Sequence, residues 1–274
     1  MQCQNELTYK LIEMKVLFIT MVASLFGVMA IAQSSKKPTI ILVHGAWSDV
    51  QAWKAVTPLL KAKGFNVKAV NLPGHGNDNT PFTTITLQSY VAAVKKEIGT
   101  SENVILVGHS MAGIVISQVA EDLPAQINKL VYLAAYLPAN GQSLLDLAKT
   151  DAGSHVGKFL QIDQTTASAG IAKEGVVDIF AADASKSIQE QFANGVKPDP
   201  LAPFASSVKL TDARFGSVQK VYIYTKNDHA ISYRKQQDMA KVGLVKVEHT
   251  LTSSHTPFIS IPQEVAAILI KEAK

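Results

Sequence analysis

The sequence predicts an α/β fold in which helices cover both faces of a mostly parallel, doubly wound sheet. First, short apolar runs alternate with longer amphipathic segments along most of the chain, which is typical of parallel strands joined by right-handed crossovers. Second, one apolar run passes directly into an apolar helical run through a small–x–Ser–x–small turn at 108–112. Third, 274 residues with 47% hydrophobic and 18% charged side chains suit a globular protein with a single core.

Each predicted strand is a short apolar run, and each predicted helix repeats apolar residues every three or four positions. Gly64 ends the first helix, and the second strand ends in a turn of sequence LPGHG. The predicted strands are Thr39–Val43, Phe65–Asn71, Val104–Val107, Ile127–Ala135, Lys220–Thr225 and Val245–Leu251. The predicted helices are Trp53–Lys63, Leu87–Ile98, a run from Ile114 to about Leu123, Tyr233–Val242 and Gln263–Lys271.

The alternation stops between Tyr136 and about Gly216. This stretch is rich in Ala, Ser, Asp and Gly, and three prolines lie close together between positions 198 and 203. Short helices are expected at Ser143–Leu147 and Ser185–Asn194, and no strong strand sequence is present. An insertion of this size between two sheet strands predicts a cap over about residues 136–216. The alternative is a long crossover with extra helices.

The N-terminal segment predicts export. Lys15 precedes an apolar run, Val16–Ala32, that ends in Ala-Ile-Ala, so residues 1–32 are expected to be a signal peptide cleaved before Gln33. The alternative is a membrane anchor, but the run is short for a spanning helix. Met14 is an alternative start, which would leave residues 1–13 untranslated. We therefore expect a single domain at 33–274, periplasmic or secreted from a bacterium, without a stable membrane anchor.

Charge and cysteine content exclude several classes of protein. The formal net charge is +4, and no block of like charges predicts a nucleic-acid surface. The one cysteine, Cys3, precedes the expected cleavage site, so the exported chain would contain no disulfide and no thiolate metal site.

Ser110 is the most informative residue of the chain. It stands in the sequence Gly-His-Ser-Met-Ala at 108–112, between a buried strand and a helix. A strand that turns into a helix through small–x–Ser–x–small is a nucleophile elbow, where the strained serine tolerates only small neighbours. The adjacent helix N-terminus favours developing negative charge. The alternative is an ordinary serine in a strand–helix turn.

A serine hydroxyl needs a base, and that base needs a carboxylate. Asp228 follows the strand Lys220–Thr225 and is expected to orient the histidine and stabilise its imidazolium; the alternative is a turn or helix-capping aspartate. His255, in SSHTP between the last strand and the last helix, is the expected base. The competing histidines are His44, His75, His109, His155, His229 and His249.

Two backbone N–H groups are expected to form an oxyanion hole. One belongs to Met111, directly after the nucleophile, and the other to Ala46, in the loop after the first strand. Metal and nucleotide motifs such as H-E-x-x-H, G-x-x-x-x-G-K-[ST] and G-x-G-x-x-G are absent from the sequence, so we expect no cofactor and no metal.

Several longer motifs accompany these residues after position 33. They are VHGAW at Val43–Trp47, PLLKAKGFNVKAVNLPGHGND at Pro58–Asp78, GHSMAG at Gly108–Gly113, AAYLP at Ala134–Pro138, the run Leu210–Met239, and SSHTPFISIPQEVAAIL at Ser253–Leu269. With them, the chain resembles the α/β-hydrolase superfamily, and within it the group of plant methylesterases, hydroxynitrile lyases and bacterial pyrethroid-hydrolase-like esterases.

The resemblance implies the α/β-hydrolase fold, with Ser110, Asp228 and His255 at the triad positions and Ala46 and Met111 at the oxyanion positions. Two departures matter. Ala112 replaces the more usual Gly, a change that should be tolerated. Thr256 follows the base histidine, where the hydroxynitrile lyases of this group carry a Lys that helps to handle cyanide.

The expected function is that of a serine carboxylesterase that acts on a small-molecule ester. The alternatives are a hydroxynitrile lyase and a ligand-binding receptor with little turnover. A dehalogenase or epoxide hydrolase would need Asp in place of Ser110. The expected substrate-binding residues are Trp47, Tyr136, Leu137 and Phe180.

Overall fold

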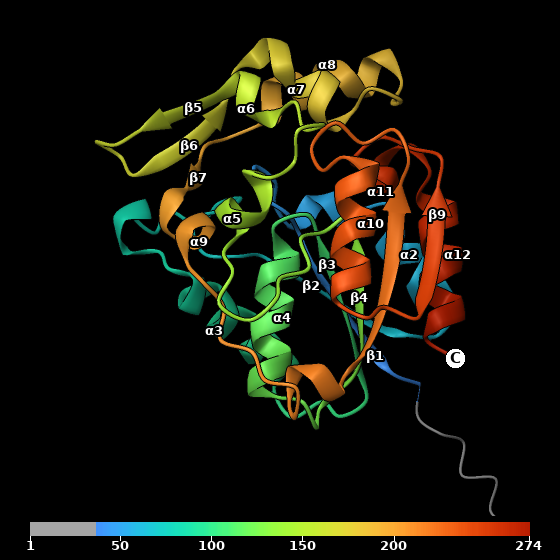
Figure 1. Ribbon diagram of the computed structural model, residues 1–274. Helices are drawn as coiled ribbons and strands as arrows, with labels where there is room; N and C mark the ends of the chain where they lie inside the picture. Colours follow the sequence, from blue (N-terminus) through green and yellow to red (C-terminus); the bar gives the residue numbers. More distant parts are fainter. Residues whose placement is uncertain (1–36) are drawn as a thin grey trace, which may run out of the picture. The chain divides into compact units, whose positions relative to one another are not determined.

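A computed structural model describes residues 37–274 and contains a six-stranded, entirely parallel sheet of order β2-β1-β3-β4-β8-β9 (Figure 1). The predicted α/β fold is therefore confirmed. All six predicted strands lie within two residues of their observed bounds, and the third extends to His109, within the predicted elbow. The strands are β1 (Thr39–Val43), β2 (Asn66–Val70), β3 (Val104–His109), β4 (Ile127–Leu133), β8 (Gln219–Thr225) and β9 (Val247–Leu251).

Helices cover both faces of the sheet, because the side chains of each buried strand alternate between two apolar clusters. In β1, Ile41 and Val43 belong to the cluster with α3, α4 and α10, whereas Ile40 and Leu42 belong to the cluster with α2 and α12. On the first face lie α3 (Leu87–Ile98), α4 (Ala112–Asp122) and α10 (Tyr233–Val242), and on the second lie α2 (Val56–Ala62) and α12 (Pro262–Glu272).

The first predicted helix is divided in the structure. Trp53 ends a separate 3₁₀ helix, η1 (Val50–Trp53), and the α-helix begins only at Val56. The Asp49 side chain caps η1 by accepting a hydrogen bond from the Gln51 N–H at 2.7 Å. Other short helices are η2 (Phe82–Thr84) and α11 (Pro257–Ser260).

The insertion between β4 and β8 contains strands as well as helices, so the expectation of no strand there is wrong. Figure 1 shows the part of this insertion from α6 to α8 (residues 156–195) beyond the carboxyl ends of the sheet strands. Its strands escape sequence analysis because most of β5 is exposed and β7 has only two residues. The elements are α5 (Leu144–Ala148), α6 (Val156–Phe159), the antiparallel β5 (Leu160–Asp163), β6 (Ser168–Ile171) and β7 (Asp199–Pro200), α7 (Lys173–Phe180), α8 (Lys186–Gly195), α9 (Leu201–Ala205) and η3 (Phe215–Ser217).

The expected signal peptide at residues 1–32 lies outside the described residues. Within residues 37–274, no helix combines the length and the apolar character that crossing a membrane requires.

Helix α4 approaches the chain after β4 so closely that no side chain fits between them. A Cβ atom built on Gly113 would lie 2.1 Å from the carbonyl oxygen of Tyr136. The N–H of Tyr136 in turn donates to the carbonyl oxygen of Ser110 at 3.1 Å. Gly113 therefore helps to hold the start of α4, and with it the elbow, against the chain that leads into the insertion.

Gly113→Ala is expected to lower the free energy of unfolding by about 3 kcal/mol, because the clash is with backbone that cannot rotate away. Gly157→Ala is the matched control, since a Cβ there meets nothing within 4 Å. Urea unfolding followed by circular dichroism measures both variants. Equal transition midpoints for the two would contradict this account of the packing.

Candidate active site

Ser110 lies at the turn between β3 and α4 with a φ of +54°. This left-handed conformation is rare for a residue with a side chain and is typical of a nucleophile elbow. Crowding is visible around it: a Cβ on Gly108 would lie 2.9 Å from both the carbonyl oxygen of Ala112 and Cδ1 of Ile116. Ala112 itself is fully buried in this turn.

The loop after β1 touches the elbow. A Cβ on Gly45 would lie 2.8 Å from Cβ of Ser110 and 2.9 Å from Nδ1 of His109. Glycine is thus the residue that allows this approach. Within residues 37–274, the N–H groups of Ala46 and Met111, the two expected oxyanion donors, make no backbone hydrogen bond.

His255 and Asp228 form a buried pair, with 2.8 Å between Nδ1 of His255 and Oδ2 of Asp228. Their side chains are 1% and 0% exposed. The carboxylate also accepts two backbone N–H groups on Oδ1, at 2.8 and 2.9 Å, and two side-chain donors on Oδ2, at 2.7 and 3.1 Å. These donors, which fix its orientation toward His255, are the N–H groups of Ala230 and Ile231, Oγ1 of Thr225 and Nε2 of Gln236.

His109 joins the serine turn to the histidine loop. Its Nε2 donates to the carbonyl oxygen of His255 at 2.9 Å, and the two rings are 4.5 Å apart. Burial and the neighbouring His255 hold the pKa of His109 well below its usual range, so this ring stays neutral. Within residues 37–274, no hydrogen bond within 3.5 Å joins the Ser110 hydroxyl to His255. The structure thus places Ser110, Asp228 and His255 on neighbouring segments that follow the carboxyl ends of β3, β8 and β9.

Residues of the insertion form hydrogen bonds with Ser254 and Thr256, the two residues next to His255 in the sequence. Asp183 accepts hydrogen bonds from the N–H of Ser254, at 2.8 Å, and from its hydroxyl. On the other side, Oγ1 of Thr256 donates to the carbonyl oxygen of Phe180 at 2.6 Å. Sequence analysis missed Asp183, since an aspartate in an Ala-rich stretch carries no signal for a partner 71 residues away.

A second buried carboxylate, also missed, joins the loop after β1 to the insertion. Asp199 of β7 is fully buried and accepts hydrogen bonds from the N–H of Trp47 at 2.5 Å, from Nε2 of His75 at 3.0 Å and from the hydroxyl of Tyr90 at 3.4 Å. The indole N–H of Trp47 donates to Ala169 of β6 at 2.9 Å. Trp47, with a φ of +56°, therefore connects the loop after β1 to strands β6 and β7 of the insertion.

The His75–Asp199 pair makes stability depend on pH. Burial lowers the pKa of His75, but the hydrogen bond and charge of Asp199 outweigh it, so the pKa is raised above 6.5. A histidine with a raised folded pKa stabilises fully below its unfolded value and loses that contribution as pH rises through the folded value. Burial and the nearby His75 lower the pKa of His44 to about 3, which gives the wild-type curve an opposite trend at low pH.

We therefore expect the stability advantage of the wild type over His75→Gln to be largest near pH 6.5 and to shrink as the pH rises above 6.5. His75→Gln also removes one of the two causes that lower the pKa of His44, so the comparison is made from pH 6.5 upward, where His44 is mostly neutral in both chains. Urea unfolding at several pH values measures the difference. A stability difference that stays constant or grows as the pH rises would contradict a raised pKa of His75 in the folded protein.

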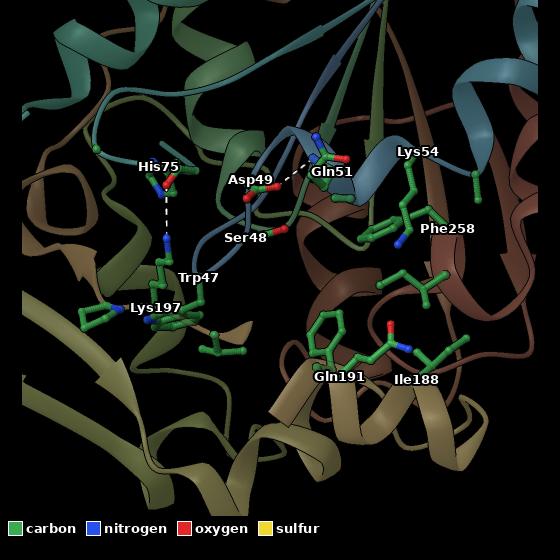
Figure 2. Close-up of a pocket in the computed structure, with 18 residues that line it drawn as sticks. Trp47, Ser48, Asp49, Gln51, Lys54, His75, Ile188, Gln191, Lys197 and Phe258 are labelled. Atoms are coloured by element: carbon green, nitrogen blue, oxygen red, sulfur yellow. Dashed lines mark hydrogen bonds between the residues drawn. The ribbon is translucent and has the colours of Figure 1, made fainter. Parts of the chain in front are cut away.

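A cavity of about 370 Å³ lies between η1, the turn at 73–76 and α8 (Figure 2). Trp47, Phe192 and Phe258 form apolar parts of its wall, and Lys197 spans one side by donating to the carbonyl oxygen of Gly76 at 3.2 Å. Its size suits a small organic ligand. Ser110 and His255 do not line it.

The expected substrate-binding residues fall into two groups. Trp47 lines the cavity and packs against Phe180 with ring centres 5.7 Å apart, and Phe180 is 5.9 Å from the His255 ring. Tyr136 and Leu137 instead belong to the main apolar core. Burial, with Asp151 and Asp228 nearby, raises the pKa of Tyr136, so its hydroxyl stays protonated.

Comparisons with known proteins agree with the fold and the motifs. The family model "Alpha/beta hydrolase family" matches residues 40–268. A putative chloroplastic methylesterase 11 of Arabidopsis thaliana is 32% identical over 248 residues, which cover 85% of this chain and 63% of that protein. Salicylic acid-binding protein 2 of Nicotiana tabacum is 27% identical over 85% of this chain and 96% of its own length.

Among solved structures, a pyrethroid hydrolase from Sphingobium faniae is 25% identical with a TM-score of 0.77, covering 86% of this chain and 97% of that one. The chain spans only 57% and 63% of the first two chloroplastic methylesterases that it matches.

Proposed function

The chain belongs to the alpha/beta hydrolase family, and from this premise we propose that it is a serine carboxylesterase acting on a small or medium ester through an acyl-enzyme. Its relatives include a methylesterase of Arabidopsis thaliana and a pyrethroid hydrolase of Sphingobium wenxiniae. The observation that carries the proposal is the strained Ser110 turn beside the buried His255–Asp228 pair, whose Nδ1–Oδ2 distance is 2.8 Å. A serine nucleophile is activated by an adjacent base that a third group orients, and the His255–Asp228 pair supplies both.

In the acylation step, Oγ of Ser110 attacks the ester carbonyl carbon while Nε2 of His255 takes its proton. The carbonyl oxygen becomes an oxyanion, which the N–H groups of Ala46 and Met111 stabilise. The C–O bond to the alcohol then breaks, and His255 returns the proton to the departing alkoxide. The alcohol leaves, and the acyl group stays on Ser110.

In the deacylation step, His255 takes a proton from water, which attacks the acyl carbon. The second oxyanion collapses, the bond to Oγ breaks, and His255 protonates Ser110 as the acid leaves. Throughout, Asp228 keeps the proton of the neutral ring on Nδ1, so that Nε2 is free to act as the base, and stabilises the imidazolium that forms.

One observation favours ester hydrolysis over cyanohydrin cleavage. The position after His255 holds Thr256, whose hydroxyl is bound to the carbonyl oxygen of Phe180. A cation at this position, as in the hydroxynitrile lyases that the sequence resembles, is thus replaced by a neutral side chain tied to the insertion.

The function is tested with p-nitrophenyl esters of increasing acyl length, from acetate to octanoate, together with methyl esters and aromatic cyanohydrins. We expect hydrolysis of esters with a maximum at short or medium acyl chains, and no release of cyanide. Cyanide release without ester hydrolysis would indicate a lyase. Thermal stabilisation by these compounds without turnover would indicate a receptor, and either result would overturn the proposal.

A further inference from the structure

Three metal-ligating side chains that the proposed reaction does not use converge beside the Asp228 loop. Both oxygens of Asp178, on α7, face an imidazole: Oδ2 is 2.7 Å from Nδ1 of His155, and Oδ1 is 2.8 Å from Nδ1 of His229. The two rings lie 4.3 Å apart. One potential ligand atom from each residue lies within 4.8 Å of the others, so a single ion could reach all three.

The backbone holds the two histidines together independently of any ion. The N–H of His155 donates to the carbonyl oxygen of His229 at 2.8 Å, and the hydroxyl of Ser154 donates to that of Ala230 at 2.7 Å. These bonds join the start of α6 to the loop that follows Asp228. The ligands are thus largely prearranged, which reduces the entropy lost on binding.

The chemistry of the three side chains selects the class of ion. Two imidazoles and one carboxylate suit Zn²⁺ and its neighbours in the transition series, whereas Mg²⁺ and Ca²⁺ prefer oxygen ligands. Burial raises the pKa of Asp178, but hydrogen bonds from His155 and His229 outweigh it and lower the pKa, so the carboxylate is ionised. The side chains of the three residues are 31–40% exposed, which leaves room for water as a fourth ligand.

Binding requires a modest rearrangement. In a tetrahedral site with Zn–N distances of about 2.0–2.1 Å, ligand atoms lie roughly 3.3 Å apart, so the present contacts of 2.7 and 2.8 Å must open by about half an ångström. Rotation of partly exposed side chains accommodates such a change. Each histidine must also present an unprotonated Nδ1, which makes binding weaker at low pH.

We propose that His155, Asp178 and His229 form a transition-metal site that binds Zn²⁺. The bound ion would link the insertion to the loop that carries Asp228. The site is structural, because its ligands lie outside the triad and the ion would join α6 and α7 to the chain that follows β8. Occupancy therefore stabilises the packing of α6 and α7 against the loop that follows β8 and leaves the chemistry to Ser110 and His255.

The test uses the untagged full chain after treatment with a chelator. Isothermal titration with Zn²⁺ and visible absorption with Co²⁺ measure stoichiometry and coordination, and thermal unfolding with and without Zn²⁺ measures stabilisation. We expect one equivalent bound, Co²⁺ bands typical of tetrahedral nitrogen and oxygen ligands, and a Tm raised by about 3 °C or more.

Asp178→Asn and His229→Gln are each expected to weaken Zn²⁺ binding by about tenfold or more and to abolish the rise in Tm. His249→Gln is the matched control, because His249 also pairs with a carboxylate, Glu272, at 2.9 Å, but no second histidine among residues 37–274 joins this pair in a potential metal site. Cys3→Ser controls for binding by the thiol. Absence of stoichiometric binding in the wild type, or binding that survives both substitutions, would overturn the proposal whether or not the chain hydrolyses esters.

Discussion

Ser110→Ala is expected to reduce kcat for p-nitrophenyl acetate by roughly 10⁴- to 10⁶-fold while the protein remains folded. The substitution removes Oγ, the only atom that can form the acyl-enzyme in the proposed mechanism. Alanine keeps the Cβ that lies close to Gly45, so packing of the elbow against the loop after β1 is unchanged. The effect should therefore fall on kcat rather than on stability.

Steady-state kinetics and circular dichroism on the same samples separate these two effects. A fluorophosphonate probe followed by mass spectrometry should add one label to the wild type and none to Ser110→Ala. Ser206→Ala is the control, because within the described part of the chain that half-buried residue's hydroxyl bonds to the carbonyl oxygen of Ala202 alone. Labelling or turnover that persists in Ser110→Ala would place the nucleophile elsewhere.

Asp228→Asn is expected to reduce kcat by about 10⁴-fold, because it reverses the tautomer of His255. Two backbone N–H groups point at Oδ1, so the amide oxygen of the introduced side chain would occupy that position and its NH₂ would face His255. Nδ1 would then accept a hydrogen bond, Nε2 would carry the proton, and the ring could no longer take a proton from Ser110.

In the wild type, Thr225 and Gln236 donate hydrogen bonds to Oδ2 of Asp228. In the variant, the same two donors would face the NH₂ group, which cannot accept these bonds. Stability should therefore also fall, by about 1–3 kcal/mol. Kinetics at saturating substrate and urea unfolding measure the two effects. Asp163→Asn, an exposed turn carboxylate that bonds to Thr165 and Thr166, is the control and should match the wild type in kcat. A loss of kcat below tenfold for Asp228→Asn would remove Asp228 from the triad.

Local patterns were sufficient to predict the sheet and its helices. Buried parallel strands such as β3 are short continuous apolar runs, and α3 and α10 repeat apolar residues with the helical period, so α3 and α10 were predicted with their observed bounds. The Ser110 turn was also visible, because its crowded backbone, with a φ of +54°, favours small residues at the second position on either side, here Gly108 and Ala112. Where the pattern is weak, as in the exposed β5, prediction failed.

The sequence by itself determined the fold class, the elbow and the segments on which the triad candidates lie, because each depends on burial or sterics within a few neighbouring residues. Only the tertiary structure decided which polar groups meet. The contacts His75–Asp199 and Ser254–Asp183 join residues 124 and 71 positions apart, and the cluster of Asp178 with two histidines joins three separate elements. Such contacts produce no periodic pattern in the sequence. They form only because the folded chain places the insertion next to the ends of the sheet strands.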